Sequence, residues 1–213
     1  MPLSRLLALV APPLCVACGA TCRVHDRLCP DCRGRLRWLG WDQAASDGLQ
    51  VWAAVGYEGP ARALVRTLKF GGAVRLVDAM AAQMAANAPP DLLADRTLVP
   101  VPLGAARRRR RGFNQAEALA GALAQRTGLE VIDCLVRAGT GARASQVGLG
   151  RDERLGALDG SIRMRPGSPV PLRALLVDDV VTTGATLCAC ADALADAGVA
   201  EIGAIAYART SGR

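Results

Sequence analysis

Two adjacent carboxylates and a turn rich in hydroxyl groups are the residues of this chain best suited to chemistry. Asp178 and Asp179 follow the apolar run 174–177, which is typical of a buried parallel strand. Between these acids and a predicted helix over 187–197 lies a small turn that contains Thr182, Thr183, Gly184, Ala185 and Thr186. A helix N-terminus offers unpaired N–H groups to a phosphate, and carboxylates suit sugar hydroxyls or Mg²⁺. The segment therefore predicts a site for a phosphorylated sugar at the carboxyl end of a strand.

The sequence at 175–187, LLVDDVVTTGATL, resembles the signature of type I phosphoribosyltransferases, which bind 5-phosphoribosyl-1-pyrophosphate (PRPP). The resemblance implies that Asp178 and Asp179 hold the ribose hydroxyls and stabilise the charge that develops on the ribose during the reaction. It also implies that the five turn residues bind the 5-phosphate, and that Mg²⁺ accompanies PRPP. The alternative interpretation is an ordinary strand, turn and helix in which the acids cap the helix.

Five of the eight cysteines lie between residues 15 and 32. Four of them form two C-x-x-C pairs separated by ten residues, a spacing that predicts a structural zinc site with the ligands Cys15, Cys18, Cys29 and Cys32. Disulfide bonds are the competing interpretation, although nothing else in the chain points to an oxidising compartment. Cys22 and His25 lie between the two pairs and could replace a ligand. His25 is the only histidine, so no imidazole is available for catalysis elsewhere.

The elements that must position these groups alternate between strands and helices. Strands are expected over 51–57, 97–101, 131–136, 174–177 and 201–207, and helices over 60–70, 76–87, 113–125 and 187–197. This alternation predicts an α/β fold with a parallel sheet flanked by helices, which matches the type I phosphoribosyltransferase class. We expect residues 1–48 to hold an N-terminal helix (3–14), the zinc ribbon and a linker, and residues 49–213 to form the phosphoribosyltransferase-like domain.

Three further blocks resemble the ComF family, small bacterial proteins in which a zinc ribbon is joined to a phosphoribosyltransferase-like domain. The blocks are YEGPARALVRTLKFGG at 57–72, VPVPLGAARRRRRGFNQAEALA at 99–120 and ARASQVGLGRDER at 142–154. The family often has asparagine soon after the arginine that matches Arg154, whereas this chain has Leu155 and Gly156. The resemblance implies a link to competence and DNA uptake, with single-stranded DNA or a protein of the competence machinery as further partners.

The second block supplies cations for an anionic ligand. Its prolines cannot continue a central strand ladder, so residues 99–103 should turn away at the same sheet edge as Asp178. Of the five arginines at 107–111, Arg107 or Arg111 is expected to bind the pyrophosphate of PRPP. Asn114 and Gln115 would add neutral hydrogen bonds. A solvated charged surface is the alternative for any single arginine.

Two other segments could contribute to the same site. The polar residues Arg143, Ser145 and Gln146 lie in a glycine-rich stretch that suits a mobile lid, for which a plain surface loop is the alternative. Lys69 could join the anion site, although a helix lysine that extends its ammonium into solvent is the more common arrangement.

Composition narrows the function classes. The net charge of +7 favours anionic ligands, and half of the residues are apolar although aromatic residues make up only 3%. No segment approaches the ~20 consecutive apolar residues of a membrane span, so we expect a cytoplasmic protein. The first hypothesis is a PRPP-binding phosphoribosyltransferase of unknown acceptor, linked to competence or nucleotide metabolism; this chemistry requires no protein nucleophile.

The second hypothesis is a non-catalytic protein that handles single-stranded DNA with the zinc ribbon and the arginine run. Its aromatic residues, apart from Trp38 and Trp41, offer little support for base stacking. A third is a regulator that binds PRPP or a nucleotide without turnover.

Overall fold

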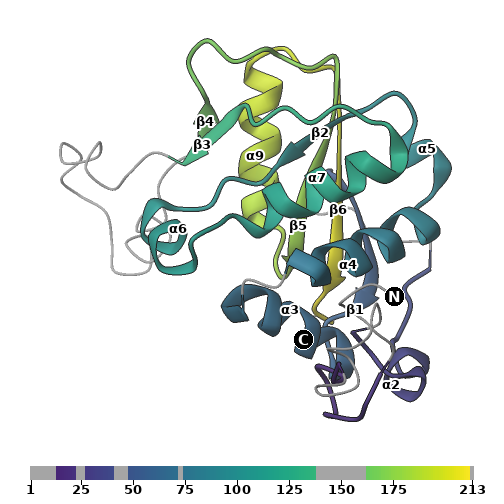
Figure 1. Cartoon of the computed structure of the whole chain (residues 1–213). Helices are drawn as coiled ribbons and strands as arrows, with labels where there is room; N and C mark the ends of the chain where they lie inside the picture. Colours follow the sequence, from purple (N-terminus) through teal and green to yellow (C-terminus); the bar gives the residue numbers. More distant parts are fainter. Residues whose placement is uncertain (1–12, 23–26, 41–47, 72–73, 138–161, 212–213) are drawn as a thin grey trace, which may run out of the picture.

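A computed structural model of the chain describes residues 13–22, 27–40, 48–71, 74–137 and 162–211. Within these residues the centre of the fold is a four-stranded parallel sheet in the order β1-β6-β5-β2 (Figure 1). Its strands are β1 (Gln50–Gly56), β2 (Thr97–Pro100), β5 (Arg173–Val181) and β6 (Glu201–Arg209). The predicted α/β class with a parallel sheet flanked by helices is confirmed.

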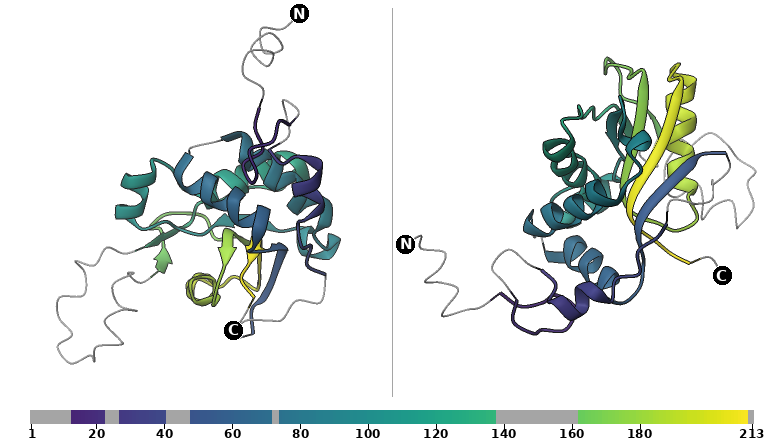
Figure 2. Two further views of the ribbon diagram at one scale, coloured as in Figure 1. Left: turned by 90° about the horizontal axis from the view of Figure 1, so that it is seen from below. Right: turned by 90° about the vertical axis from the view of Figure 1, so that its right-hand side faces the viewer.

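Helices cover both faces of this sheet, as the right-hand view of Figure 2 shows. The helices α3 (Gly59–Gly71), α4 (Val74–Asn87) and α7 (Gln115–Thr127) lie on one face, and α9 (Ala185–Asp196) lies on the other. Because side chains alternate along a strand, Leu175 and Val177 of β5 pack in the core with α3, α4 and α7, whereas Ala174 and Leu176 pack in the core with α9. Burial on both faces explains the continuous apolar run before the acids.

Three short helices complete the helical elements that are described: α2 (Pro30–Gly34), α5 (Pro90–Leu93) and α6 (Ala105–Arg111). All five consecutive arginines belong to α6, and none of the residues of this helix is buried. The helix ends at Gly112, which adopts φ of +79°, a conformation that glycine reaches without strain. The chain then enters α7 directly.

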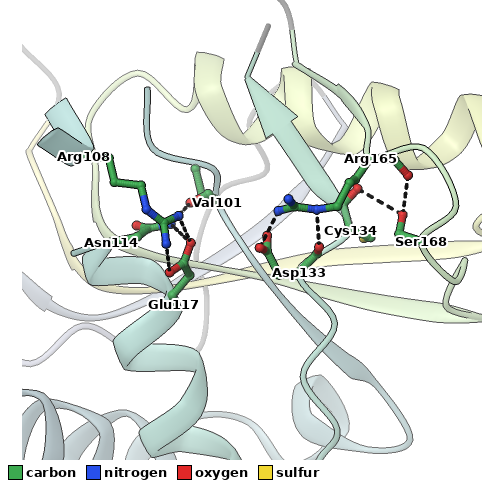
Figure 3. Close-up of polar contacts among 8 residues, drawn as sticks. All are labelled: Val101, Arg108, Asn114, Glu117, Asp133, Cys134, Arg165 and Ser168. Carbon is green, nitrogen blue, oxygen red and sulfur yellow. Dashed lines mark hydrogen bonds and ion pairs between the residues drawn. The ribbon is translucent and has the colours of Figure 1, made fainter. Parts of the chain in front are cut away.

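The strand predicted over 131–136 is correct only in part, because only its last residues belong to a strand and that strand lies outside the central sheet. Val131 makes only a single parallel bridge to Leu98, and the chain continues as β3 (Leu135–Arg137) in a separate antiparallel pair with β4 (Ile162–Met164). At the end of this strand pair, Asp133 forms an ion pair with Arg165 (Figure 3). The backbone N–H of Arg165 donates to the carbonyl of Cys134 at 2.7 Å, so the contact between the two segments continues beyond β3 and β4.

Several predictions fall outside the described residues. These are His25, Trp41, the lid residues Arg143, Ser145 and Gln146, and nearly all of the helix expected over 3–14. At the end of that expected helix, Leu14 forms an antiparallel bridge with Thr21.

The chain between the cysteines and the sheet runs along the outer edge of β1. Trp38 forms an antiparallel bridge with Val55, the N–H of Leu39 donates to the carbonyl of Ala54 at 3.0 Å, and Gly56 donates to Arg37 at 2.9 Å. Residues 37–39 therefore cover an edge that would otherwise expose unpaired backbone groups. Among the described helices none is long and apolar enough to cross a membrane.

Candidate functional site

The two predicted acids lie where β5 loses its neighbour β2. The pairing of β2 with β5 ends at Pro100 and Val177, while β5 continues beside β6 as far as Val181. Asp178 and Asp179 therefore lie inside β5. The sequence alone had indicated that they follow the end of the strand. Alternation directs them to opposite faces of the sheet, Asp178 with Leu176 toward α9 and Asp179 with Val177 toward α3 and α7.

A lysine from α3 reaches the second acid. The Lys69 Nζ lies 3.0 Å from Oδ2 of Asp179, whose residue is only 7% exposed. Asp178 accepts a hydrogen bond from the backbone N–H of Asp179 at 2.8 Å. Burial, and next to it the charge of Asp179, raise the pKa of Asp178 to about 8. Near neutral pH Asp178 therefore holds its proton in the absence of a ligand.

The turn after the acids forms a small cavity of about 40 Å³. Its lining includes Asp178 and all five residues predicted to bind a phosphate: Thr182, Thr183, Gly184, Ala185 and Thr186. Gly184 adopts φ of +82° at the N-cap of α9, where an L side chain would be strained. The first N–H groups of the 12-residue helix α9 follow at Ala185 and Thr186, so the cavity combines hydroxyl groups with a helix N-terminus.

A larger cavity of about 180 Å³ lies beside the first one and shares Asp178, Val180 and Thr186 with it. Both acids line it, and so do four cationic side chains from α3, α6 and β3: Lys69, Arg107, Arg111 and Arg137. Residues 101–103, which follow β2, also line it, as the prolines predicted. With four cations and two carboxylates, one of them with a raised pKa, this cavity favours an anion.

The structure thus brings Arg107, Arg111 and Gln115 to the cavity that the acids line. Asn114 also lines this cavity, but its role is mainly structural because its side chain caps α7. Its Oδ1 accepts from the N–H of Ala116 at 3.1 Å, and its Nδ2 donates to the carbonyl of Val101 at 3.0 Å (Figure 3). These bonds join the start of α7 to the end of β2.

Sequence reasoning missed Arg137, which reaches the cavity from β3. The expected strand stopped just before this residue, and no motif marks it. Its position a few residues before the predicted lid was a signal that could have drawn attention to it.

The four predicted metal ligands lie together. The Sγ atoms of Cys15, Cys18, Cys29 and Cys32 are all within 4.8 Å of one another, and those of Cys18 and Cys29 are 3.7 Å apart. Tetrahedral zinc with bonds of about 2.3 Å requires sulfur atoms roughly 3.8 Å apart. The cluster can therefore hold a structural metal such as zinc. None of the eight cysteines forms a disulfide.

One cysteine of the cluster has surroundings that favour its thiolate. Although burial opposes it, backbone N–H groups of Cys29, Ala17 and Cys18 directed at the sulfur lower the pKa of Cys15 to about 6. Burial and the neighbouring cysteines raise the pKa of Cys32 to about 12. Cys22 is not one of the four, and its thiol donates to the carbonyl of Pro13 at 3.4 Å.

Comparison with known families agrees with this geometry. The family model described as phosphoribosyl transferase domain matches residues 71–212, well over half of the chain. The chain belongs to this phosphoribosyl transferase domain family. It is also 36% identical to "Competence protein ComFC" of Streptococcus pneumoniae (strain ATCC BAA-255 / R6) over 104 residues. The aligned residues are 49% of this chain and 44% of that protein. Together with the cysteine cluster, these matches bear out the resemblance to ComF proteins.

The chain thus spans less than half the length of the curated relative that it matches. Among solved structures, an orotate phosphoribosyltransferase from Aeropyrum pernix has 18% identity and a TM-score of 0.39, over 82% of this chain and 75% of that chain. A hypoxanthine phosphoribosyltransferase from Staphylococcus aureus has 12% identity and a TM-score of 0.33, over 61% of each chain.

Proposed function

We propose that this protein binds PRPP with Mg²⁺ and transfers its phosphoribosyl group to an acceptor. The observation that carries the proposal is the placement of Asp178 in the lining of two cavities of different chemistry, with Asp179 beside it in the larger one. One cavity offers hydroxyl and N–H groups at the start of α9, and the other offers four cations. A phosphorylated ribose that carries a diphosphate has the same order of groups: phosphate, ribose hydroxyls, diphosphate.

In this arrangement the residues 182–186 hold the 5-phosphate and the two acids hold the ribose hydroxyls. The cations of the larger cavity hold the diphosphate, which leaves with the electron pair of the C1–O bond. The remaining positive charge on the ribose ring lies beside Asp178 and Asp179, and the acceptor then bonds to C1. Mg²⁺ accompanying PRPP would add charge neutralisation of the diphosphate, and the carboxylates and ribose hydroxyls are oxygen ligands that suit it.

The biological setting follows from the relative's name. Because the matched Streptococcus pneumoniae protein is called a competence protein, we propose that this chain acts in the cytoplasm in DNA uptake or in nucleotide metabolism. Single-stranded DNA and proteins of the competence machinery are proposed partners. Arg109 and Arg110 of α6 are exposed and are not among the residues that line the larger cavity, so they are available for such a partner.

Titration calorimetry with PRPP and Mg²⁺ tests the proposal. We expect the wild-type protein to bind and the double variant Asp178→Asn/Asp179→Asn to lose detectable binding, because the ribose loses both carboxylates. The double variant Asp192→Asn/Asp196→Asn is a matched control, since these acids of α9 are exposed and line neither cavity. It should bind as the wild type does, and circular dichroism should show that all forms are folded.

Unchanged PRPP affinity in the folded Asp178→Asn/Asp179→Asn protein would contradict the site assignment. Absence of binding to the wild-type protein would contradict the proposed function as a whole. Nucleic acid would then be the next ligand to test.

A further inference from the structure

Two arginines one turn apart on α6 are held in different ways. The Arg108 guanidinium forms a double contact with a carboxylate: its Nη1 lies 2.7 Å from Oε1 of Glu117 and its Nη2 lies 3.3 Å from Oε2 (Figure 3). Arg108 is not among the residues that line the larger cavity. Arg111 does line it, and its Nη1 donates to Oε1 of Gln115 at 3.0 Å.

The difference between the two partners is one of charge. A carboxylate orients a guanidinium and also cancels most of its field, whereas an amide oxygen orients it and leaves the positive charge in place. Arg108 is thus neutralised where it stands, while Arg111 keeps its charge beside the cavity. Lys69, by contrast, already faces Asp179 at 3.0 Å.

We propose that Gln115 is a positioning residue that holds Arg111 toward the anionic end of the ligand without neutralising it. The assignment rests on the proposed function, because it takes that anion to be the diphosphate of PRPP. It makes Arg111, rather than Arg108, an uncompensated cation of α6 that serves the cavity. Gln115 acts through Arg111 and does not itself need to touch the ligand.

The setting of Gln115 supports this role. Its residue is only 2% exposed, and it is the first residue of α7, directly after the Asn114 cap that ties the helix to Val101. The amide is therefore fixed in place before any ligand arrives. The Oε1 of Gln115 accepts from Arg111, but its Nε2 has no hydrogen-bond partner among the described residues. Burial of an unsatisfied amide is unfavourable for folding, which argues for a functional reason to keep it.

Helix stability does not explain the choice of glutamine. An acidic side chain in the first turn of α7 would interact favourably with the helix dipole. Glutamate would also form a stronger bond to Arg111. Glutamate at this position would therefore stabilise the fold, but it would neutralise the positive charge that Arg111 brings to the cavity.

The test compares three single variants in calorimetry with PRPP and Mg²⁺, at low and at high NaCl concentration. We expect Gln115→Glu to bind roughly tenfold more weakly and with a shallower dependence on salt, because Arg111 no longer attracts the anion. Gln115→Leu removes the hydrogen bond and adds no charge, so we expect a loss of only about threefold with the salt dependence of the wild type. Arg108→Gln is the matched control on the same helix. It should change the affinity less than about twofold, because Glu117 already neutralises Arg108 and exposed ion pairs contribute little energy.

Each outcome decides the assignment. Wild-type affinity in Gln115→Glu would overturn the assignment of Gln115 as a positioning residue. Equal losses of affinity in Gln115→Glu and Gln115→Leu, with the same salt dependence, would also overturn it, since they would indicate a purely structural residue. Absence of PRPP binding to the wild-type protein would overturn the proposed function and this assignment together. The two failures are therefore distinguishable.

Discussion

The two carboxylates at the end of the β2–β5 pairing have different electrostatic surroundings. Strand alternation directs them to opposite faces, and among the described residues Asp179 forms an ion pair with Lys69 at 3.0 Å. Burial next to the charge of Asp179 raises the pKa of Asp178 to about 8. In the absence of ligand, Asp178 is consequently a group that the fold holds in its protonated form near neutral pH.

This raised pKa predicts a pH-dependent stability. An unfolded aspartate titrates near pH 3.9, so between pH of about 4 and about 8 the folded protein holds a proton that the unfolded chain has released. The contribution of Asp178 to stability is therefore present in full below about pH 4 and is lost as the pH rises toward 8. We expect Asp178→Asn, which cannot ionise, to unfold at a higher temperature than the wild type above pH 8 in the absence of ligand.

Thermal unfolding of both proteins across this pH range measures the effect, because contributions shared by the two proteins cancel in the difference. Melting temperatures that run parallel with pH would contradict the raised pKa.

At the scale of elements, the site depends on how α7 is joined to β2. Asn114 caps α7 through Ala116 and also donates to the carbonyl of Val101 just beyond β2. The carbonyl beyond an ended strand would otherwise lack a partner, and the first N–H groups of the helix would too. A single buried side chain therefore satisfies that carbonyl and one N–H of the helix, that of Ala116, and places the start of α7 at the cavity.

Replacement of Asn114 should therefore reduce stability by more than an exposed cap does. We expect Asn114→Ala to lower the free energy of unfolding by about 2 kcal/mol, because it removes the cap and the bond to Val101 together. Asn114→Ser can still cap the helix and should lose only about 1 kcal/mol. Urea denaturation monitored by circular dichroism gives both values, and equal losses in the two variants would show that the bond to Val101 contributes nothing.

At the scale of the whole molecule, the cysteine cluster is packed onto the α/β core. Cys15, Cys29 and Cys32 belong to the same buried cluster as Trp52 and Leu64. The chain then covers the edge of β1 at 37–39 before it enters the sheet. A metal held by the cysteines would accordingly stabilise more than its own ribbon. The proposed boundary between residues 48 and 49 stays a prediction.

Metal removal should therefore affect the entire fold. We expect purified protein to contain a single zinc ion per chain, and a strong chelator to lower the melting temperature of the whole protein and to promote aggregation through the uncovered edge of β1. Metal analysis and calorimetric melting check this. Cys32→Ser should reproduce the loss, whereas Cys22→Ser should retain the metal because Cys22 lies outside the cluster. Metal retained in Cys32→Ser, or a melting temperature unaffected by chelation, would contradict the expectation.

Much of the fold could be predicted from the sequence because its signals are local. Apolar runs and helical periodicity depend on neighbouring residues, so the alternating strands and helices were expected close to their observed bounds. The prediction over 131–136 was correct only in part, for the opposite reason. Its apolar residues suited a strand of the central sheet, but residues 135–137 pair with β4 (Ile162–Met164), far along the chain, in a separate sheet.

The candidate site shows the same division. By itself, the sequence determined the pair of acids, the hydroxyl-rich turn and the four clustered cysteines, because each is a spacing of residues within one short segment. Only the tertiary structure decided that Lys69 pairs with Asp179 and that Arg137 lines the same cavity. It also decided that Arg108 pairs with the carboxylate of Glu117, whereas Arg111 bonds to the neutral amide of Gln115. Such pairings depend on which elements the sheet brings together, and hydrogen bonds and charges act over a few ångströms of space whatever the separation along the chain.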